Sequence, residues 1–234
     1  MKAVLLGAGK GTRLAPITHR VPKILAPLGG VPLLHRQLDY LAANGIDEVA
    51  LNVHHHVDLV ERALEERPPQ IPVRLSYEER LLGTAGALVP LREFLDEPFI
   101  LLYGDVVTDA PLRTLAAAHA HSGALATLAC YPSEETLGKG TLELDAGGRV
   151  TAFAEKAAAG GEALVNAGIY ALDPGVLAFV EGEAPDFGHD VWPAALAAGA
   201  LLRGWPLDGY LRDIGAPDSL AAAENDLAAG RIAW

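Results

Sequence analysis

Glycines and basic residues near the amino terminus form the part of this sequence most able to bind a charged ligand. The segment Gly7-Ala8-Gly9-Lys10-Gly11-Thr12-Arg13 follows an apolar run, and residues 1–38 contain six Lys or Arg but no Asp or Glu. Closely spaced glycines let backbone N–H groups approach an anion and surround it as a concave nest. Arg13 can bind two phosphate oxygens at once. The spacing predicts a phosphate-binding loop, with a plain glycine-rich turn as the alternative.

The spacing of these glycines excludes two common nucleotide motifs. The dinucleotide fingerprint G-x-G-x-x-G would require a glycine at Thr12. The P-loop pattern G-x4-G-K-[ST] would require a glycine at Val4 and a hydroxyl residue at Gly11.

An aspartate follows a second apolar run further along the chain. Tyr103-Gly104-Asp105 comes at the end of the strand-like segment 98–103. Open α/β sheets bind their ligands at the carboxyl ends of parallel strands. A carboxylate there suits Mg²⁺, which takes one or two protein carboxylates and completes its shell with phosphate oxygens and water. The alternative is an aspartate that caps the next turn.

Two consecutive segments, LGAGKGTRLAPIT and VPKILAPLGGVPLL, resemble the signature of the sugar-1-phosphate nucleotidylyltransferases, L-A-x-G-x-G-T-R-L followed by P-K-x-L-x-P. The resemblance implies that Arg13 contacts the triphosphate and that Lys23 holds the phosphates, both as catalytic residues. The other nucleotide-binding residues that it implies in these segments and before Asp105 are Leu6, Ala8, Gly9, Gly11, Thr12 and Gly104.

The same resemblance implies two metal ligands. The family carries a magnesium-binding Asp in a Gly-Asp motif, here Asp105, and a second in the element W-x-D-I-G-T-P, which residues 209–217 resemble. The second ligand is therefore Asp213. Leu211, Ala216 and Leu220 depart from the pattern, whereas the Asp-Ile-Gly core is kept.

Base recognition is implied for a third motif. Leu82-Gly83-Thr84-Ala85-Gly86 resembles the L-G-T-x-x-A/G loop, so Gly83 and Thr84 would lie near the base. Glu78 stands where uridylyl- and thymidylyltransferases of the family often carry Gln. A carboxylate only accepts hydrogen bonds, and guanine offers N1–H and N2–H₂ side by side, so Glu78 favours GTP. The alternative is a solvated Glu78 in a run of charged residues.

The sugar phosphate is assigned by resemblance to the second half of the chain. Glu155-Lys156 resembles the family's E-K pair, and Asn166-Ala-Gly-Ile-Tyr170 its N-x-G-x-Y strand. A carboxylate and an amide suit sugar hydroxyls, and Lys156 suits the phosphate. Gly140 matches a family glycine, although Lys139 precedes it in place of an aromatic residue.

The elements that must position these residues alternate between strands and helices. Apolar runs at 2–7, 48–53, 73–77, 98–103 and 124–130 predict strands, and the segments between them predict helices, at 32–44, 57–66, from Thr84 onward, and at 111–121. Later segments predict an antiparallel or mixed extension (141–145, 148–156, 163–172) and helices at 174–180, 190–198 and 217–228.

We expect an α/β fold, a Rossmann-like open mixed sheet with helices on both faces. By resemblance it is of the nucleotide-diphospho-sugar transferase type. The prediction is a single domain over 1–234, with a nucleotide half at about 1–130 and a sugar half at about 131–234.

Composition limits the class of partner. The net charge of −12 opposes general binding of nucleic acid. The single cysteine, Cys130, predicts a buried core thiol and suits a reducing compartment. The apolar run at the amino terminus is too short for a signal peptide, and no membrane span is expected. These features predict a cytoplasmic protein.

The predicted activity joins an NTP, with GTP favoured, to a sugar 1-phosphate, with a mannose-like sugar favoured, and needs Mg²⁺. A uridylyl- or thymidylyltransferase acting on another sugar 1-phosphate is the alternative, and a non-catalytic regulatory protein that binds sugar nucleotides is the alternative of another class. The oligomeric state stays open. His54, His55 and His56 would point to alternating faces of an extended strand and so do not predict a shared metal site.

Overall fold

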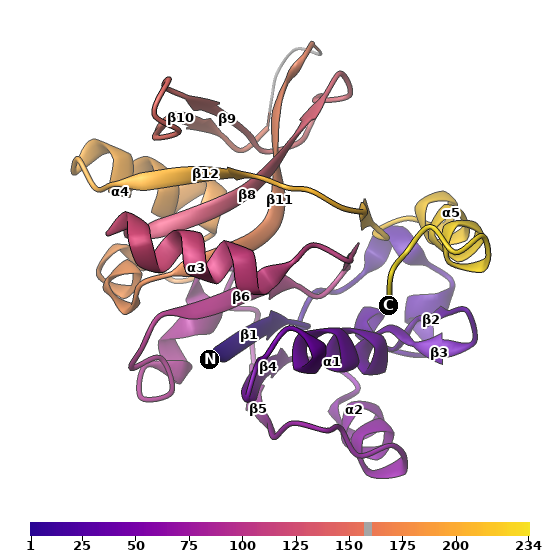
Figure 1. The fold of residues 1–234 in the computed structure, drawn as a ribbon. Coiled ribbons are helices and arrows are strands. Elements are labelled where there is room, and N and C mark those ends of the chain that lie inside the picture. Colours follow the sequence, from indigo (N-terminus) through magenta and orange to yellow (C-terminus); the bar gives the residue numbers. More distant parts are fainter. Residues whose placement is uncertain (157–160) are drawn as a thin grey trace. The chain divides into compact units, whose positions relative to one another are not determined.

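The computed structural model describes residues 1–156 and 161–234 (Figure 1). The contacts among these residues divide the chain into two compact units. Unit 1 comprises Met1–Leu81, Leu102–Pro111 and Asp208–Trp234. Unit 2 comprises Leu82–Leu101 and Leu112–Leu207. Each unit therefore collects segments that are distant in sequence, and β6 (Phe99–Tyr103) begins in unit 2 and ends in unit 1.

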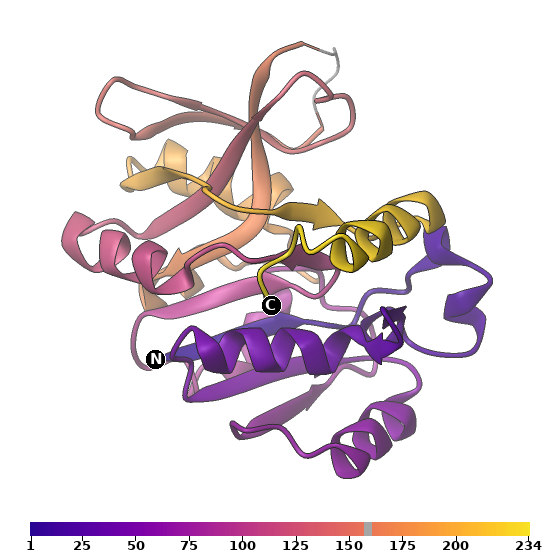
Figure 2. The ribbon, with the colours of Figure 1, turned by 45° about the vertical axis from the view of Figure 1, so that its right-hand side comes forward.

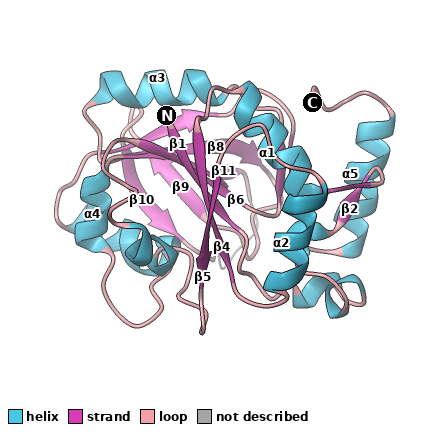
Figure 3. Cartoon of the chain, turned by 90° about the horizontal axis from the view of Figure 1, so that it is seen from below, coloured by secondary structure: helices cyan, strands magenta, loops and turns pink. Residues whose placement is uncertain are grey.

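Three parallel strands with two connecting helices form the frame of unit 1. Strands β1 (Lys2–Leu6), β4 (Glu48–Val53) and β5 (Val73–Tyr77) are adjacent in that order. Helices α1 (Leu33–Ala43) and α2 (Val57–Glu66) make the crossovers. Right-handed crossovers that step in one direction place both helices on one face, as Figure 3 shows. The carboxyl ends of the strands meet at one edge, where Leu6 pairs with Asn52 and Val53 with Tyr77.

A buried apolar cluster holds the later segments of unit 1 to its amino-terminal region. Strand β7 (Val106–Thr108) pairs antiparallel with β13 (Leu211–Asp213), and α5 (Pro217–Ala228) follows. A short hairpin, β2 (Pro27–Leu28) and β3 (Val31–Pro32), precedes α1. The cluster combines buried residues from these elements and the loops beside them: Leu14, Ala26, Leu28, Leu33, Val107, Ile214, Leu220, Ala223 and Ile232. Since Val107 and Ile214 belong to it, the cluster fixes the segments next to Asp105 and Asp213.

Polar contacts also fix β13 and the carboxyl terminus. Asp226, which is 8% exposed, accepts hydrogen bonds from the Tyr210 hydroxyl at 2.7 Å and from Arg212 at 3.1 Å. Asp109, which lacks a counterpart in the family motifs, accepts from the backbone N–H of Tyr210 and of Ala233. The carboxyl terminus lies beside α1, where the ring centroids of Tyr40 and Trp234 are 6.4 Å apart, as Figure 2 shows.

Unit 2 contains a mixed sheet centred on β8 (Ala126–Ser133). This strand pairs antiparallel with β11 (Ala163–Leu172) and parallel with β12 (Leu202–Pro206). Strands β9 (Thr141–Leu144) and β10 (Val150–Ala154) form an antiparallel pair, and β9 also pairs with β11. Helices α3 (Leu112–Ser122) and α4 (Trp192–Ala197) complete the unit. Cys130 lies on β8 with no exposed surface, and burial raises the pKa of its thiol to about 11.

The structure differs from the predicted elements where glycine and proline are frequent. The helix expected from Thr84 onward is a 3₁₀ helix, Gly86–Leu91, that contains Pro90. The helix expected at 174–180 is also a 3₁₀ helix, Pro174–Phe179, and α4 is preceded by a π-helical turn, Phe187–Val191. Strand β12 escaped prediction because its sequence, LRGWP, contains two residues depleted in strands. None of the described helices is long and apolar enough to cross a membrane.

Candidate active site

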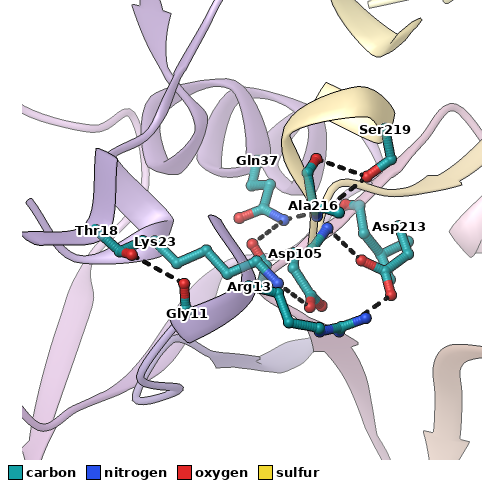
Figure 4. A network of polar contacts seen from close by, with 12 residues as sticks. Gly11, Arg13, Thr18, Lys23, Gln37, Asp105, Asp213, Ala216 and Ser219 are labelled. Atoms are coloured by element: carbon teal, nitrogen blue, oxygen red, sulfur yellow. Dashed lines mark hydrogen bonds and ion pairs between the residues drawn. The ribbon is translucent and has the colours of Figure 1, made fainter. Parts of the chain in front are cut away.

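The glycine-rich loop begins directly after β1, at the edge where the parallel strands of unit 1 end. Gly7 and Ala8 are buried, whereas Gly9, Thr12 and Arg13 are exposed. Gly11 has a φ of 61°, and its carbonyl oxygen accepts from the Thr18 hydroxyl at 2.9 Å (Figure 4). A side chain at Gly11 would meet Thr18 and Lys23 at 2.7 and 3.1 Å. The left-handed backbone and this close packing both require glycine, and they hold the loop against the segment that carries Lys23.

Lys23 forms an ion pair with Asp105. Its ammonium group contacts the carboxylate, and the two side chains are 12% and 24% exposed. Lys23 begins a 3₁₀ turn after Pro22, whose φ is −62°. Asp105 follows Gly104, where a side chain would lie 2.3 Å from the Leu6 carbonyl oxygen. Only glycine at 104 lets the end of β6 lie this close to β1, so Asp105 stands beside the glycine-rich loop.

Asp213 and Arg13 form the exposed side of the same cluster. An Arg13 nitrogen lies 4.0 Å from an Asp213 oxygen, and these side chains are 71% and 58% exposed. Asp213 also accepts from the backbone N–H of Gly215. Partial burial raises the pKa of Asp213, and the charge of Asp105 raises it further, while Lys23, the Gly215 N–H and Arg13 lower it. The two carboxylates are therefore close enough to repel each other.

Helix α1 contributes an amide that holds the backbone on both sides of Asp105. Gln37 is fully buried, and its Nε2 donates to the carbonyl oxygens of Gly104 and Val106, each at 3.1 Å. The carbonyl oxygen of Asp105 itself accepts from Ile214 N at 2.9 Å. These bonds tie Asp105 to α1 and to the residue after Asp213 (Figure 4).

Glu78 also lies in unit 1, directly after β5. It is 2% exposed, and its Oε1 accepts from the Asn52 amide at 2.7 Å. The solvated alternative considered for Glu78 is therefore wrong. Its contact with a base stays a prediction.

The histidine run follows β4 at the same edge. His54 and His55 are half-buried and His56 is exposed, with a φ of 54°. Burial lowers the pKa of His55, and the neighbouring histidines and Lys10 lower it further. His54 donates through Nδ1 to the carbonyl oxygen of Glu78 at 2.8 Å.

The predicted base loop lies in unit 2, where it is bonded to the segment before α4. Gly83 has a φ of 80°, and a side chain there would lie 2.4 Å from the Pro185 carbonyl oxygen. The Thr84 hydroxyl donates to Asp186 at 2.6 Å and accepts from Phe187 N at 3.0 Å. Through these hydrogen bonds, Thr84 holds the loop to the segment that contains Asp186 and Phe187. Base contacts of Gly83 and Thr84 stay predictions.

The residues predicted to bind the sugar phosphate gather within unit 2. A side chain at Gly140 would lie 3.3 Å from a Glu155 oxygen and 3.4 Å from Asn166 Cβ. Asn166 N donates to the Gly140 carbonyl oxygen at 2.8 Å, and the Asn166 amide donates to the buried Tyr170 hydroxyl at 2.7 Å. Lys156 is exposed next to Glu155. The structure thus brings together the first three residues and places the lysine at their margin.

Glu155 lies against Gly188, a contact that the sequence motifs do not indicate. A side chain at Gly188 would lie 1.6 Å from Glu155 Oε2. Burial raises the pKa of Glu155, and Asp186 raises it further, while His189 and Lys156 lower it. Asp186 in turn accepts from Gly188 N at 2.9 Å. The segment 186–189 therefore belongs to this cluster.

We refer to Arg13, Lys23, Asp105 and Asp213 as the charged cluster of unit 1. Its two cations and two carboxylates cancel in charge. In the described part of the chain, no three or more His, Cys, Asp or Glu are arranged to hold a metal ion. Two hard carboxylates would supply only part of a coordination shell, which is the usual share of the protein when Mg²⁺ also binds phosphate oxygens and water. The donor set fits that ion.

Comparison with known sequences gives relatives along almost the whole chain. The family profile described as "Nucleotidyl transferase" matches residues 2–230. The mannose-1-phosphate guanylyltransferase catalytic subunit beta of Xenopus tropicalis is 33% identical over 223 residues, covering 93% of this chain and 62% of that protein. The UTP–glucose-1-phosphate uridylyltransferase of a Synechocystis strain is 33% identical over 234 residues, covering 92% and 60%. The chain spans about three-fifths of the length of these relatives.

Solved structures share the fold. HddC from Yersinia pseudotuberculosis complexed with GMP-PN gives a TM-score of 0.83 at 22% identity, covering 97% of this chain and 99% of that chain. A putative glucose-1-phosphate thymidylyltransferase from Bacillus anthracis gives 0.85 at 20% identity, covering 96% and 94%. These likenesses confirm the predicted α/β fold class with its mixed sheet. The profile match over residues 2–230 shows that this chain belongs to the nucleotidyl transferase family.

Proposed function

We propose that this chain is a magnesium-dependent sugar-1-phosphate nucleotidylyltransferase. The observation that carries the proposal is the charged cluster of unit 1. Lys23 and Asp105 form an ion pair in it, and Arg13 and Asp213 lie 4.0 Å apart. The cluster stands beside a glycine loop at the carboxyl ends of parallel strands, where α/β sheets bind their ligands.

The proposed reaction needs no proton transfer by the protein. A phosphate oxygen of the sugar 1-phosphate attacks the α-phosphorus of the NTP, the bond from that phosphorus to the bridging oxygen breaks, and pyrophosphate leaves. The attacking phosphate is already largely dianionic near neutral pH. Positioning and electrostatic stabilisation of the phosphates are then the main contributions of the enzyme.

Each member of the charged cluster has a role in this proposal. Arg13 binds triphosphate oxygens through its paired nitrogens. Lys23 places a point charge on the phosphates of the leaving group. Asp105 and Asp213 would hold Mg²⁺, which supplies positive charge to the reacting phosphates when bound.

In unit 2, Gly140, Glu155, Lys156 and Asn166 are proposed to bind the sugar phosphate. Glu155 and Asn166 offer hydrogen-bonding groups to hydroxyls, and the exposed Lys156 offers a cation to the phosphate. Glycine at 140 leaves space between Glu155 and Asn166, since a side chain there would lie 3.3 Å from the Glu155 carboxylate.

GTP and a mannose-like sugar 1-phosphate are the favoured substrates. The Xenopus tropicalis relative, which is 33% identical and is named a mannose-1-phosphate guanylyltransferase subunit, supports this choice. The Synechocystis uridylyltransferase, equally similar, supports UTP with glucose 1-phosphate as the second candidate.

The test is pyrophosphate release with each NTP against a panel of sugar 1-phosphates, with MgCl₂ and with EDTA. We expect the highest kcat/KM for GTP with mannose 1-phosphate, and loss of turnover in EDTA. A uridylyltransferase would instead prefer UTP. A regulatory protein that binds sugar nucleotides without catalysis would bind them in calorimetry and release no pyrophosphate from any pair. Absence of both turnover and binding would exclude the proposal.

A further inference from the structure

A buried chain of hydrogen bonds connects the first glycine of the phosphate loop to Glu78. Gly7 N donates to Asn52 Oδ1 at 2.8 Å, and Asn52 Nδ2 donates to Glu78 Oε1 at 2.7 Å. Asn52 is 4% exposed and Glu78 2%. The chain links three segments that follow or end parallel strands of unit 1.

The chemistry of the groups fixes the orientation of the Asn52 amide. A backbone N–H can only donate, so the oxygen of the amide must face Gly7. The nitrogen end then faces Glu78, and an ionised carboxylate can only accept. The Gly7 N–H and the Glu78 carboxylate therefore select the same orientation of the Asn52 amide.

Both ends of this series of hydrogen bonds are held by further contacts. Glu78 N donates to the Val53 carbonyl oxygen at 2.8 Å, and the Glu78 carbonyl oxygen accepts from His54 Nδ1 at the same distance. At the other end, a side chain on Gly7 would lie 2.7 Å from Leu51 Cδ1 and 3.0 Å from the Asn52 carbonyl oxygen. The loop therefore starts in direct contact with β4.

We propose that Asn52 and Glu78 are positioning residues of the phosphate loop. The proposal rests on the proposed function, because it takes the loop to bind the phosphates of an NTP. Asn52 occupies the Gly7 N–H, so the N–H groups that meet phosphate begin after Gly7. Glu78 acts through Asn52, because its Oε1 accepts the hydrogen bond from the Asn52 amide.

Positioning of the loop and direct contact with the base are two possible roles of Glu78, and they predict different binding of a ligand that has no base. We would measure binding of inorganic tripolyphosphate, GTP and UTP by calorimetry, and kcat and KM with each NTP, for Asn52→Ala, Glu78→Ala and Glu78→Gln. Glu79→Gln and Asn225→Ala are matched controls, since both residues are exposed.

Positioning predicts that Asn52→Ala and Glu78→Ala each weaken all three ligands by about tenfold, because each leaves a buried polar group unpaired. The ratio of GTP to UTP should stay unchanged. Glu78→Gln keeps an acceptor for Asn52, so its binding should stay within about twofold of the wild type, on the scale of surface substitutions. The double variant Asn52→Ala/Glu78→Ala should be little worse than either single variant, because the residues act in one chain.

Hydrogen exchange by NMR tests the geometry even if an alanine variant fails to fold. The Gly7 amide should be protected in the wild type and in Glu78→Gln. A Gly7 amide that exchanges freely in the folded wild type would overturn the proposal, as would unchanged tripolyphosphate binding by folded Asn52→Ala. A Glu78→Gln variant that alters the GTP to UTP ratio without altering tripolyphosphate binding would assign Glu78 to the base instead. A wild type that binds no NTP at all would instead refute the proposed function.

Discussion

The charged cluster of unit 1 and the residues gathered around Glu155 in unit 2 are held by different means. In unit 1, opposite charges and backbone bonds hold the functional side chains, as in Lys23 with Asp105 and Gln37 on either side of that aspartate. In unit 2, the absence of a side chain on glycine is what matters, because Gly140 and Gly188 leave the volume in which Glu155 lies. The first cluster should therefore be most sensitive to loss of charge, and the second to added volume.

Removing a charge from unit 1 should give the largest effect. We expect Lys23→Ala and Asp105→Asn each to lower kcat by roughly 10²–10³, the usual consequence of losing a group that stabilises developing charge. The double variant should fall by less than the product, since the residues contact each other. Steady-state pyrophosphate release measures this. Asp58→Asn, on the exposed face of α2, is the control and should match the wild type.

Adding volume in unit 2 should give the next largest effect. The new methyl group of Gly188→Ala would displace the Glu155 carboxylate, which lies at the end of a flexible side chain, so the fold should survive. We expect KM for the sugar 1-phosphate to rise about ten- to a hundredfold, as misplaced contacts often do, with KM for the NTP unchanged. Gly147→Ala is the control, because the new methyl group would meet only the end of the exposed Asp145 side chain, at 3.3 Å. An equal rise in both KM values would contradict the separation of the two clusters.

Loosening Asp105 without changing charge should give a smaller effect. Gln37→Met keeps the volume of the side chain and removes both bonds to the backbone around Asp105. It also removes Oε1, which is buried without a hydrogen-bond partner among the described residues. These effects on the free energy of unfolding oppose each other, so we expect a change in Tm of only a few degrees, on the order of 1 kcal/mol. The Mg²⁺ concentration that gives the half-maximal rate should rise several-fold. The Mn²⁺ concentration for half-maximal binding, measured by electron paramagnetic resonance, should rise by a similar factor. Exposed Gln70→Met should change neither.

The smallest effect should come from the charge on Glu155. Burial and Asp186 raise its pKa, so the folded state holds this proton more tightly than the unfolded chain does. The stability from this group is fully present below its unfolded pKa and is lost as pH rises through the folded value. Glu155→Gln should therefore be slightly more stable than the wild type near pH 7, with a free energy of unfolding higher by up to about 0.5 kcal/mol. It should also lose that pH dependence. Greater stability combined with weaker sugar binding would sharpen the contrast between the units. A free energy of unfolding at pH 7 equal to that of the wild type would contradict the raised pKa of Glu155.

Segments with continuous apolar character were the most predictable part of the fold. The runs at 2–7, 48–53 and 73–77 match β1, β4 and β5 to within one residue. Short pairings such as β7 with β13 carry too few residues for a periodic pattern, and their pairing is decided by contacts across the chain. The discontinuous composition of the units is likewise a property of contacts, since Asp208–Trp234 joins the amino-terminal segment in unit 1.

The residues of the candidate site likewise divide into those that the sequence indicates and those that only the structure reveals. Motifs indicated the charged residues, and the structure brings Lys23 and Asp105 into contact. Asn52, Gln37 and Gly188 were missed because each acts through a contact between distant segments. Gly7 and Asn52 are 45 residues apart, and Gln37 and Gly104 are 67 apart. A polar residue at a buried position of an apolar strand or helix was the available signal, and both Asn52 and Gln37 carry it.

The burial of Cys130 makes the native protein well suited to site-specific labelling. It is the only cysteine in the sequence, and with a pKa of about 11 its thiol stays protonated and unreactive toward maleimides near neutral pH. A cysteine introduced at exposed Asp58 in unit 1 and another at exposed Leu137 in unit 2 could therefore carry a fluorophore pair without a background label. Energy transfer between them would then measure, in solution, whether adding nucleotide or sugar 1-phosphate changes the distance between the two labels.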